Sequence, residues 1–92
     1  MPMKTQKLPE EYLLELGHRL RIIRTFLKLD QRQMSELMKT GQSQISKIEA
    51  GRSAPTIYQL FKIKKIAEED DYLRENLSWE WILEGKGKGI IG

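Results

Sequence analysis

The chain has 92 residues, of which 39% are hydrophobic and 32% are charged, and its formal net charge at pH 7 is +3. A chain of this length holds one small domain, and the absence of cysteine excludes disulfides, thiolate metal sites and a cysteine nucleophile. No apolar run reaches the roughly 20 residues of a membrane-spanning helix, and no signal peptide follows Met1. We therefore expect a soluble, cytoplasmic protein that makes no membrane contact.

The N-terminal part of the chain predicts an arm followed by a long helix. Residues 1–8 show no periodic pattern and are expected to be flexible. The first helix is expected to begin at Pro9, because proline is tolerated in a first turn and Glu10 and Glu11 suit the helix dipole. Apolar residues then recur every three or four positions and form one core-facing stripe: Leu13, Leu16, Leu20, Ile23 and Leu27.

The next segment predicts two short helices joined by a tight turn. Asp30 is expected to cap the second helix, with Gln33 completing a capping box. A turn ends at Gly41, because glycine adopts backbone angles that other residues resist. A third helix is expected over residues 42–50, and Gly51 ends it. Two helices with this connection form a helix-turn-helix.

The following residues predict a fourth helix and an acidic segment. Thr56 is expected to cap the fourth helix, whose broad apolar face runs to Ala67. The acidic run 68–71 lacks the glycine and alternating oxygen ligands of a calcium loop, so we expect solvated acids. The segment 68–76 is expected to be either a long link or a continuation of the fourth helix.

The C-terminal residues complete an expected all-α bundle of five helices. Ser78 is expected to cap a short fifth helix over residues 79–84, and residues 85–92 are expected to form a flexible basic tail. The tail sequence GKGKG follows no strand and opens no helix, so it does not predict a phosphate-binding loop. The domain itself is expected to span residues 9–84.

The third helix has the composition of a surface that reads DNA. Ile45 and Ile48 define its inward face, because helix residues are about 100° apart, while Ser43, Ser46 and Lys47 point outward. Glutamine bonds adenine in bidentate fashion, and lysine bonds guanine or phosphate. The alternative is an ordinary polar surface helix.

Charge is distributed unevenly along the chain. Residues 16–66 contain eleven Lys/Arg and three Asp/Glu, whereas residues 67–84 contain one arginine and seven acids. A basic body followed by an acidic patch favours one face turned to phosphates and another turned away. Ordinary solvated helix faces are the alternative interpretation.

From about Leu16 to Ala67 the chain resembles lambda-repressor-like, Xre/Cro-type helix-turn-helix proteins. The matching residues are Arg24, Leu29-Asp30-Gln31, Gln42-Ser43 and Ile45-Ser46-Lys47-Ile48-Glu49, with Gly51 and Pro55 at the usual spacing. The chain departs from the family pattern at Ser35, Thr40 and Lys64, and Lys28 and Lys39 replace turn glycines.

The resemblance and the polar face together define the expected site. The residues expected to contact bases are Gln42, Ser43, Gln44 and Lys47. The residues expected to contact phosphates are Gln31, Arg32, Thr40, Ser46, Arg52 and Ser53. The resemblance also implies a largely buried ion pair between Arg24 and Glu49, so Glu49 is expected to be structural.

Other candidate sites are weaker. His18 is the only histidine and there is no cysteine, so we expect no metal site and no cofactor, and a surface or packing role for His18. Two nearby tryptophans suggest a dimer contact, for which Trp79 and Ile82 are the candidates, with Trp81 in the core. A twofold dimer would match a palindromic operator.

These observations lead to one leading function and one alternative. We expect a sequence-specific double-stranded DNA-binding regulator, a homodimeric repressor, without enzymatic activity. The alternative is an antitoxin that inhibits a toxin-type protein partner through its C-terminal segment and autoregulates its promoter.

Overall fold

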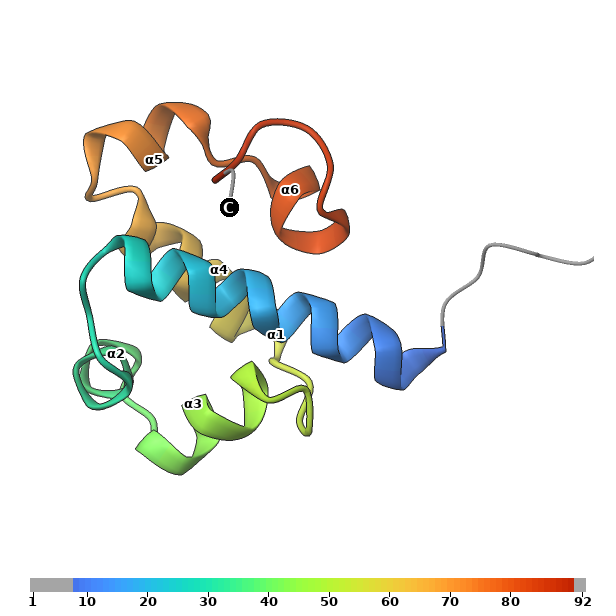
Figure 1. Cartoon of the computed structure of the whole chain (residues 1–92). Helices are drawn as coiled ribbons and strands as arrows, with labels where there is room; N and C mark the ends of the chain where they lie inside the picture. Colours follow the sequence, from blue (N-terminus) through green and yellow to red (C-terminus); the bar gives the residue numbers. More distant parts are fainter. Residues whose placement is uncertain (1–7, 91–92) are drawn as a thin grey trace, which may run out of the picture.

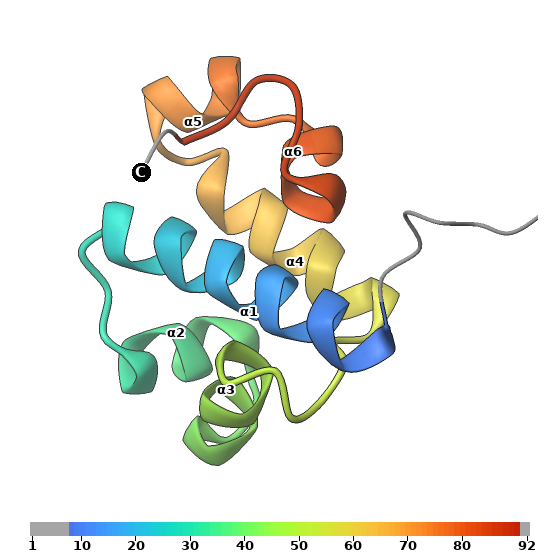
Figure 2. The same ribbon diagram turned by 45° about the vertical axis from the view of Figure 1, so that its right-hand side comes forward.

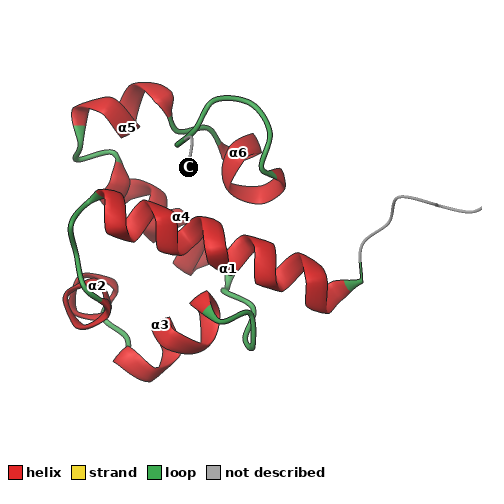
Figure 3. Cartoon of the chain, in the orientation of Figure 1, coloured by secondary structure: helices red, strands yellow, loops and turns green. Residues whose placement is uncertain are grey.

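A computed structural model describes residues 8–90 as a bundle in which every regular element is a helix (Figures 1 and 3). This confirms the all-α prediction. Residues 1–7, most of the predicted arm, and the last two residues of the predicted tail lie outside the described range. The helices are α1 (Pro9–Phe26), α2 (Gln31–Met38), α3 (Gln42–Glu49), α4 (Ile57–Ala67), α5 (Asp71–Asn76) and α6 (Trp79–Glu84).

Helix α1 runs through the middle of the bundle. Helices α2 and α3 lie on one side of α1, and α5 and α6 lie on the other, while α4 crosses α1 (Figures 1 and 2). The predicted stripe supplies Leu16, Leu20 and Ile23 to the core, where these side chains are almost fully buried. The core therefore joins both halves of the molecule along one face of α1. None of the helices in residues 8–90 is long and apolar enough to cross a membrane.

The predicted count of five helices is wrong, because residues 71–76 form a separate helix, α5. Helix α4 ends at Ala67, and Asp70 then caps α5 by accepting a hydrogen bond from the Leu73 backbone N–H at 3.0 Å. Leu73 and Leu77 are buried in the core. The acidic segment is thus neither a link nor a continuation of α4, because a change of direction is needed to bury these two leucines.

Most helix starts agree with the sequence. Asp30 and Thr56 each form a capping box, and Ser78 accepts a hydrogen bond from the Trp81 backbone N–H at 3.0 Å. These caps satisfy backbone N–H groups that have no partner within their helix. The expected helix starts after residues 30, 56 and 78 are therefore confirmed.

The last described residues pack against α6. The Ser78 hydroxyl and backbone N–H both donate to the Lys88 carbonyl, at 2.7 Å and 3.0 Å. Gly89 lies directly against the Trp81 ring, and Ile90 is buried. Residues 85–90 thus pack as part of the bundle, which differs from the flexible tail that the glycines suggested.

A buried arginine joins α1 to α6, and the sequence analysis missed it. Arg19 Nε donates to the Ile82 carbonyl at 2.8 Å, and its Nη2 donates to the Leu83 carbonyl at 3.1 Å. The Tyr12 hydroxyl donates to the same Leu83 carbonyl at 2.9 Å. These bonds satisfy carbonyls at the C-terminus of α6 that lack helical partners. The sequence feature that could have indicated its burial is the position of Arg19 beside Leu16 and Leu20, two residues of the core-facing stripe.

Candidate nucleic-acid interface

Three helix ends that position α2 and α3 use the same backbone motif. Lys28, Lys39 and Gly51 follow the ends of α1, α2 and α3, and each is in the left-handed conformation, with φ of 61°, 56° and 76° respectively. After α2, the Thr40 N–H donates to the Ser35 carbonyl at 3.0 Å, as in a Schellman motif. The same pattern of bonds follows α1 and α3.

The prediction about Gly41 is wrong in detail. Its φ is −81°, an extended conformation open to any residue, and it serves as the N-cap of α3. The sharp change of direction occurs instead at Lys39. The sequence does not predict this turn at residue 39, because residue 39 is a lysine and a residue in the left-handed conformation is more often glycine.

The inward face of α3 is anchored as predicted. Ile45 and Ile48 are buried in the core, which places Gln42, Ser43 and Lys47 on the solvent side. Small and uncharged side chains dominate this exposed face near the N-terminus of α3. The helix can therefore approach another molecule closely and offer amide, hydroxyl and ammonium groups to it.

Gln44 differs from the other three residues predicted to contact bases. It is half-buried, and its Nε2 donates to the Ser53 hydroxyl at 3.3 Å. This bond connects α3 to the loop that precedes α4. Gln44 and Ser53 were assigned separate roles, to bases and to phosphates, but the structure brings them together at one edge of the surface.

Glu49 is the centre of a buried polar cluster behind the exposed face. Arg24 Nε and Nη2 donate to its two carboxylate oxygens, at 2.7 Å and 3.0 Å, and both side chains are less than 10% exposed. Gln31 Nε2 donates to Glu49 Oε1 at 3.1 Å, and Arg24 Nη1 donates to the Leu29 carbonyl at 2.7 Å. The predicted Arg24–Glu49 pair therefore lies in place and also holds the first residue of α2.

The remaining residues predicted to contact phosphates lie near the ends of α2 and after α3, except Ser46, which lies in the middle of α3. Arg32 is exposed and pairs with Glu36 at 3.0 Å, while Arg52 is exposed in the loop after α3. Thr40 and Ser46 are half-buried. An exposed pair such as Arg32–Glu36 is weakly held, so the guanidinium can exchange Glu36 for another anion.

A close backbone contact sets the position of α3 relative to α1. A side chain at Gly17 would clash with the Ile48 carbonyl and lie 2.8 Å from the Glu49 carbonyl oxygen. Only glycine lets the two helices approach this closely. The sequence analysis missed this contact, although a glycine inside an amphipathic helix is a signal for close packing, because it costs about 1 kcal/mol relative to alanine.

The acidic segment lies on the other side of α1 from α2 and α3 (Figure 1), and two of its carboxylates, those of Glu68 and Asp71, form ion pairs. Lys64 Nζ lies 2.8 Å from Glu68 Oε2, and Lys65 Nζ lies 3.8 Å from Glu68 Oε1. The hydrogen bond from Lys64, with the nearby positive charges, holds the pKa of Glu68 below its ordinary value. Arg74 pairs with Asp71 at 2.7 Å.

Comparison with known proteins places the chain in a family. A helix-turn-helix domain family matches residues 17–88, which is most of the chain. The chain belongs to this family. The resemblance seen in its sequence is thereby confirmed, and the matched residues include α5, α6 and residues 85–88.

One solved structure with a similar fold is the clp gene regulator ClgR from Corynebacterium glutamicum. The TM-score is 0.57 at 23% sequence identity, and the match covers 66% of this chain and 62% of the ClgR chain. The helix-turn-helix domain thus corresponds to less than two thirds of that chain, and the likeness concerns the fold. No curated protein matches the sequence.

The residues considered for roles outside the DNA surface are placed as follows. No group of three or more His, Cys, Asp or Glu residues within positions 8–90 could hold a metal ion. His18 is exposed on α1, which agrees with the first of its two expected roles, on the surface or in packing.

Ile82 is only 1% exposed, so its prediction as a dimer contact is wrong, because this side chain of α6 fills the core. Trp81 is buried as predicted, and Trp79 is 39% exposed.

Proposed function

We propose that this protein is a sequence-specific, double-stranded DNA-binding transcriptional regulator. In this proposal α2 and α3 form the helix-turn-helix, and α3 enters the major groove. The observation that carries the proposal is the exposed polar face of α3, where Gln42, Ser43 and Lys47 lie opposite the buried Ile45 and Ile48. Glutamine and lysine can bond the base edges that distinguish one sequence from another.

The surroundings of α3 supply groups suited to the phosphate backbone. Gln31 and Arg32 begin α2, where backbone N–H groups and the helix dipole favour an anion. Arg52 and Ser53 follow the C-terminal end of α3. In our proposal these residues, with Thr40 and Ser46, bind phosphates on both sides of the groove and orient α3, while Gln44 contacts a base beside Ser53.

We further propose that the protein acts as a repressor and binds a palindromic operator as a homodimer. Many helix-turn-helix proteins place their two recognition helices about one DNA turn apart. A compact domain that occupies such a site blocks access to the promoter. No catalytic role is assigned, because the polar groups beside α3 are either solvent-facing donors or members of the structural Glu49 cluster.

The antitoxin alternative depends on an exposed aromatic C-terminal segment. Trp81 and Ile82 are instead buried, and residues 85–90 are bonded to Ser78 and packed on Trp81. Little of this segment is left to bind a toxin-type partner, so the alternative loses its main support.

The proposal is tested by fluorescence anisotropy with a labelled duplex from the upstream region of the gene and a scrambled duplex, across a salt series. We expect tighter binding to the native duplex. Gln42→Ala and Lys47→Ala should each weaken that binding by about 1–3 kcal/mol, because each removes a base contact. Lys86→Ala is the control, since Lys86 is exposed and far along the chain from α3.

Two outcomes would contradict the proposal. Equal binding to both duplexes that falls steeply with salt would indicate phosphate attraction without recognition. Unchanged affinity in both α3 variants would remove α3 from the recognition surface.

A further inference from the structure

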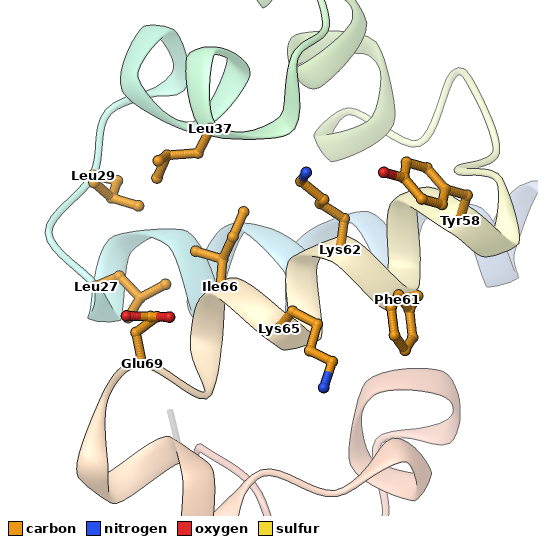
Figure 4. Close-up of a pocket in the computed structure, with 9 residues that line it drawn as sticks. All are labelled: Leu27, Leu29, Leu37, Tyr58, Phe61, Lys62, Lys65, Ile66 and Glu69. Atoms are coloured by element: carbon orange, nitrogen blue, oxygen red, sulfur yellow. The ribbon is translucent and has the colours of Figure 1, made fainter.

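An open apolar groove of about 610 Å³ lies along α4, outside the proposed DNA surface (Figure 4). Leu37 of α2 and Leu29 form one wall, and Tyr58, Phe61 and Ile66 of α4 form the floor. Leu37, Tyr58 and Phe61 are each about half exposed or more. Large apolar side chains gathered in this way indicate a surface that another molecule covers.

Two ionisable residues of opposite sign lie along the same groove. Lys62 and Glu69 both line it, and within residues 8–90 neither has an ion-pair partner. The neighbouring Lys65 already has two partners: its Nζ lies 5.4 Å from the centre of the Phe61 ring, in a cation–π contact, and 3.8 Å from the Glu68 carboxylate. Lys62 belongs to α4 and Glu69 to the turn that follows this helix, and the Ile66 side chain lies between them (Figure 4).

This arrangement is self-complementary under a twofold rotation. In a symmetric contact, residue i of one copy meets residue j of the other, and j meets i. If two α4 helices pack antiparallel with the axis near Ile66, each Lys62 meets the partner's Glu69, and the two Ile66 side chains meet between these ion pairs. A partner whose contact surface carried charge of only one sign would leave either Lys62 or Glu69 without an ion-pair partner.

The position of the groove is compatible with simultaneous DNA binding. None of the residues that line it belongs to α3 or to the loop 50–56. A second copy in the groove would therefore leave Gln42, Ser43 and Lys47 uncovered on both copies. The exposed Trp79 offers less, because Lys64 already lies over its ring at 5.6 Å and its neighbour Ile82 is buried.

We infer that the α4 groove binds a second copy of this chain, through Leu37, Phe61 and Ile66 and two symmetric Lys62–Glu69 ion pairs. This inference rests on the proposed function, for which it names the surface that joins the two copies.

The test is sedimentation equilibrium of the full chain without DNA. We expect the wild type to show twice the chain mass of 10.8 kDa. Lys62→Glu and Glu69→Lys should each weaken the dimer about 10- to 100-fold, because each reversal places two like-charge pairs at the interface. The double variant Lys62→Glu/Glu69→Lys should recover the wild-type dissociation constant, since it restores both pairs with their signs exchanged.

Matched controls separate this effect from net charge and from folding. Lys86→Glu and Glu84→Lys make the same changes of charge at exposed positions outside the groove and should leave the dimer unchanged. Circular dichroism checks that every variant remains helical. Trp79→Ala should also keep the dimer.

A monomeric wild type, single reversals without effect, or a double variant that stays monomeric would each overturn the inference. Dimer loss in Trp79→Ala but not in Lys62→Glu would move the interface to α6. Because no DNA is present, these results are distinct from a failure of the proposed function, which is measured by anisotropy.

Discussion

Glu49 accepts hydrogen bonds from Arg24 of α1 and Gln31 of α2 while itself belonging to α3. One carboxylate thus ties together three helices at the back of the proposed DNA surface. The pair with Arg24 is predictable from the sequence because both residues match a known motif. The bond to Gln31 is harder to predict, because a glutamine at the start of a helix suits a phosphate equally well.

We predict that Glu49→Ala lowers the free energy of unfolding by about 3–5 kcal/mol, because it leaves the buried Arg24 guanidinium unpaired. Chemical denaturation measures this change. Glu36→Ala breaks an exposed pair with Arg32 and should cost less than about 1 kcal/mol. A double variant Arg24→Met/Glu49→Leu should recover much of the lost stability. Equal effects of Glu49→Ala and Glu36→Ala would contradict the structural role of Glu49.

At the scale of elements, helix starts are predictable and several helix ends are not. Asp30, Thr56 and Ser78 cap their helices through local side-chain bonds, so a few neighbouring residues carry the information. Lys28 and Lys39 instead adopt left-handed backbone angles that their side chains do not favour. Their conformation is imposed by the packing of the helices on each side, which local sequence does not reveal.

Replacing Lys39 with glycine should therefore stabilise the protein. Glycine has no Cβ to strain the left-handed conformation, and we expect Lys39→Gly to raise the free energy of unfolding by about 1 kcal/mol. Thermal and chemical denaturation both report this. Gly41→Ala is a useful comparison, because φ is −81° and the added Cβ would meet only Ser43 Oγ at 4.0 Å, so little strain should result. A destabilised Lys39→Gly variant would show that Lys39 makes a compensating contact.

At the scale of the whole molecule, the two ends of residues 8–90 are linked through α6. Arg19 and Tyr12 of α1 bond the C-terminal carbonyls of α6, and Lys88 bonds back to Ser78. The sequence predicts that α6 exists but not what surrounds it. Glycine and lysine dominate residues 85–89 and suggest flexibility, whereas the contact between Gly89 and the Trp81 ring depends on tertiary packing.

Deleting residues 85–92 should consequently destabilise the bundle. The deletion removes the buried Ile90 side chain and exposes Trp81, and we expect a loss of about 2–3 kcal/mol from the apolar surface returned to water. Equilibrium denaturation of the shortened chain measures it, and deletion of residues 91–92 alone serves as the control. An unchanged unfolding midpoint in the shortened chain would mean that residues 85–90 contribute no net stability.

The two tryptophans also provide a built-in optical reporter. Trp81 is enclosed by the core and by Gly89, whereas Trp79 is partly exposed beneath the Lys64 ammonium. In a Trp79→Phe variant, all tryptophan emission would come from Trp81. Because indole emission shifts to longer wavelength on contact with water, the emission maximum of Trp81 would report whether residues 85–90 are packed against its ring or dissociated from it. The closure of the C-terminal segment could thus be timed by stopped-flow fluorescence without attaching a dye.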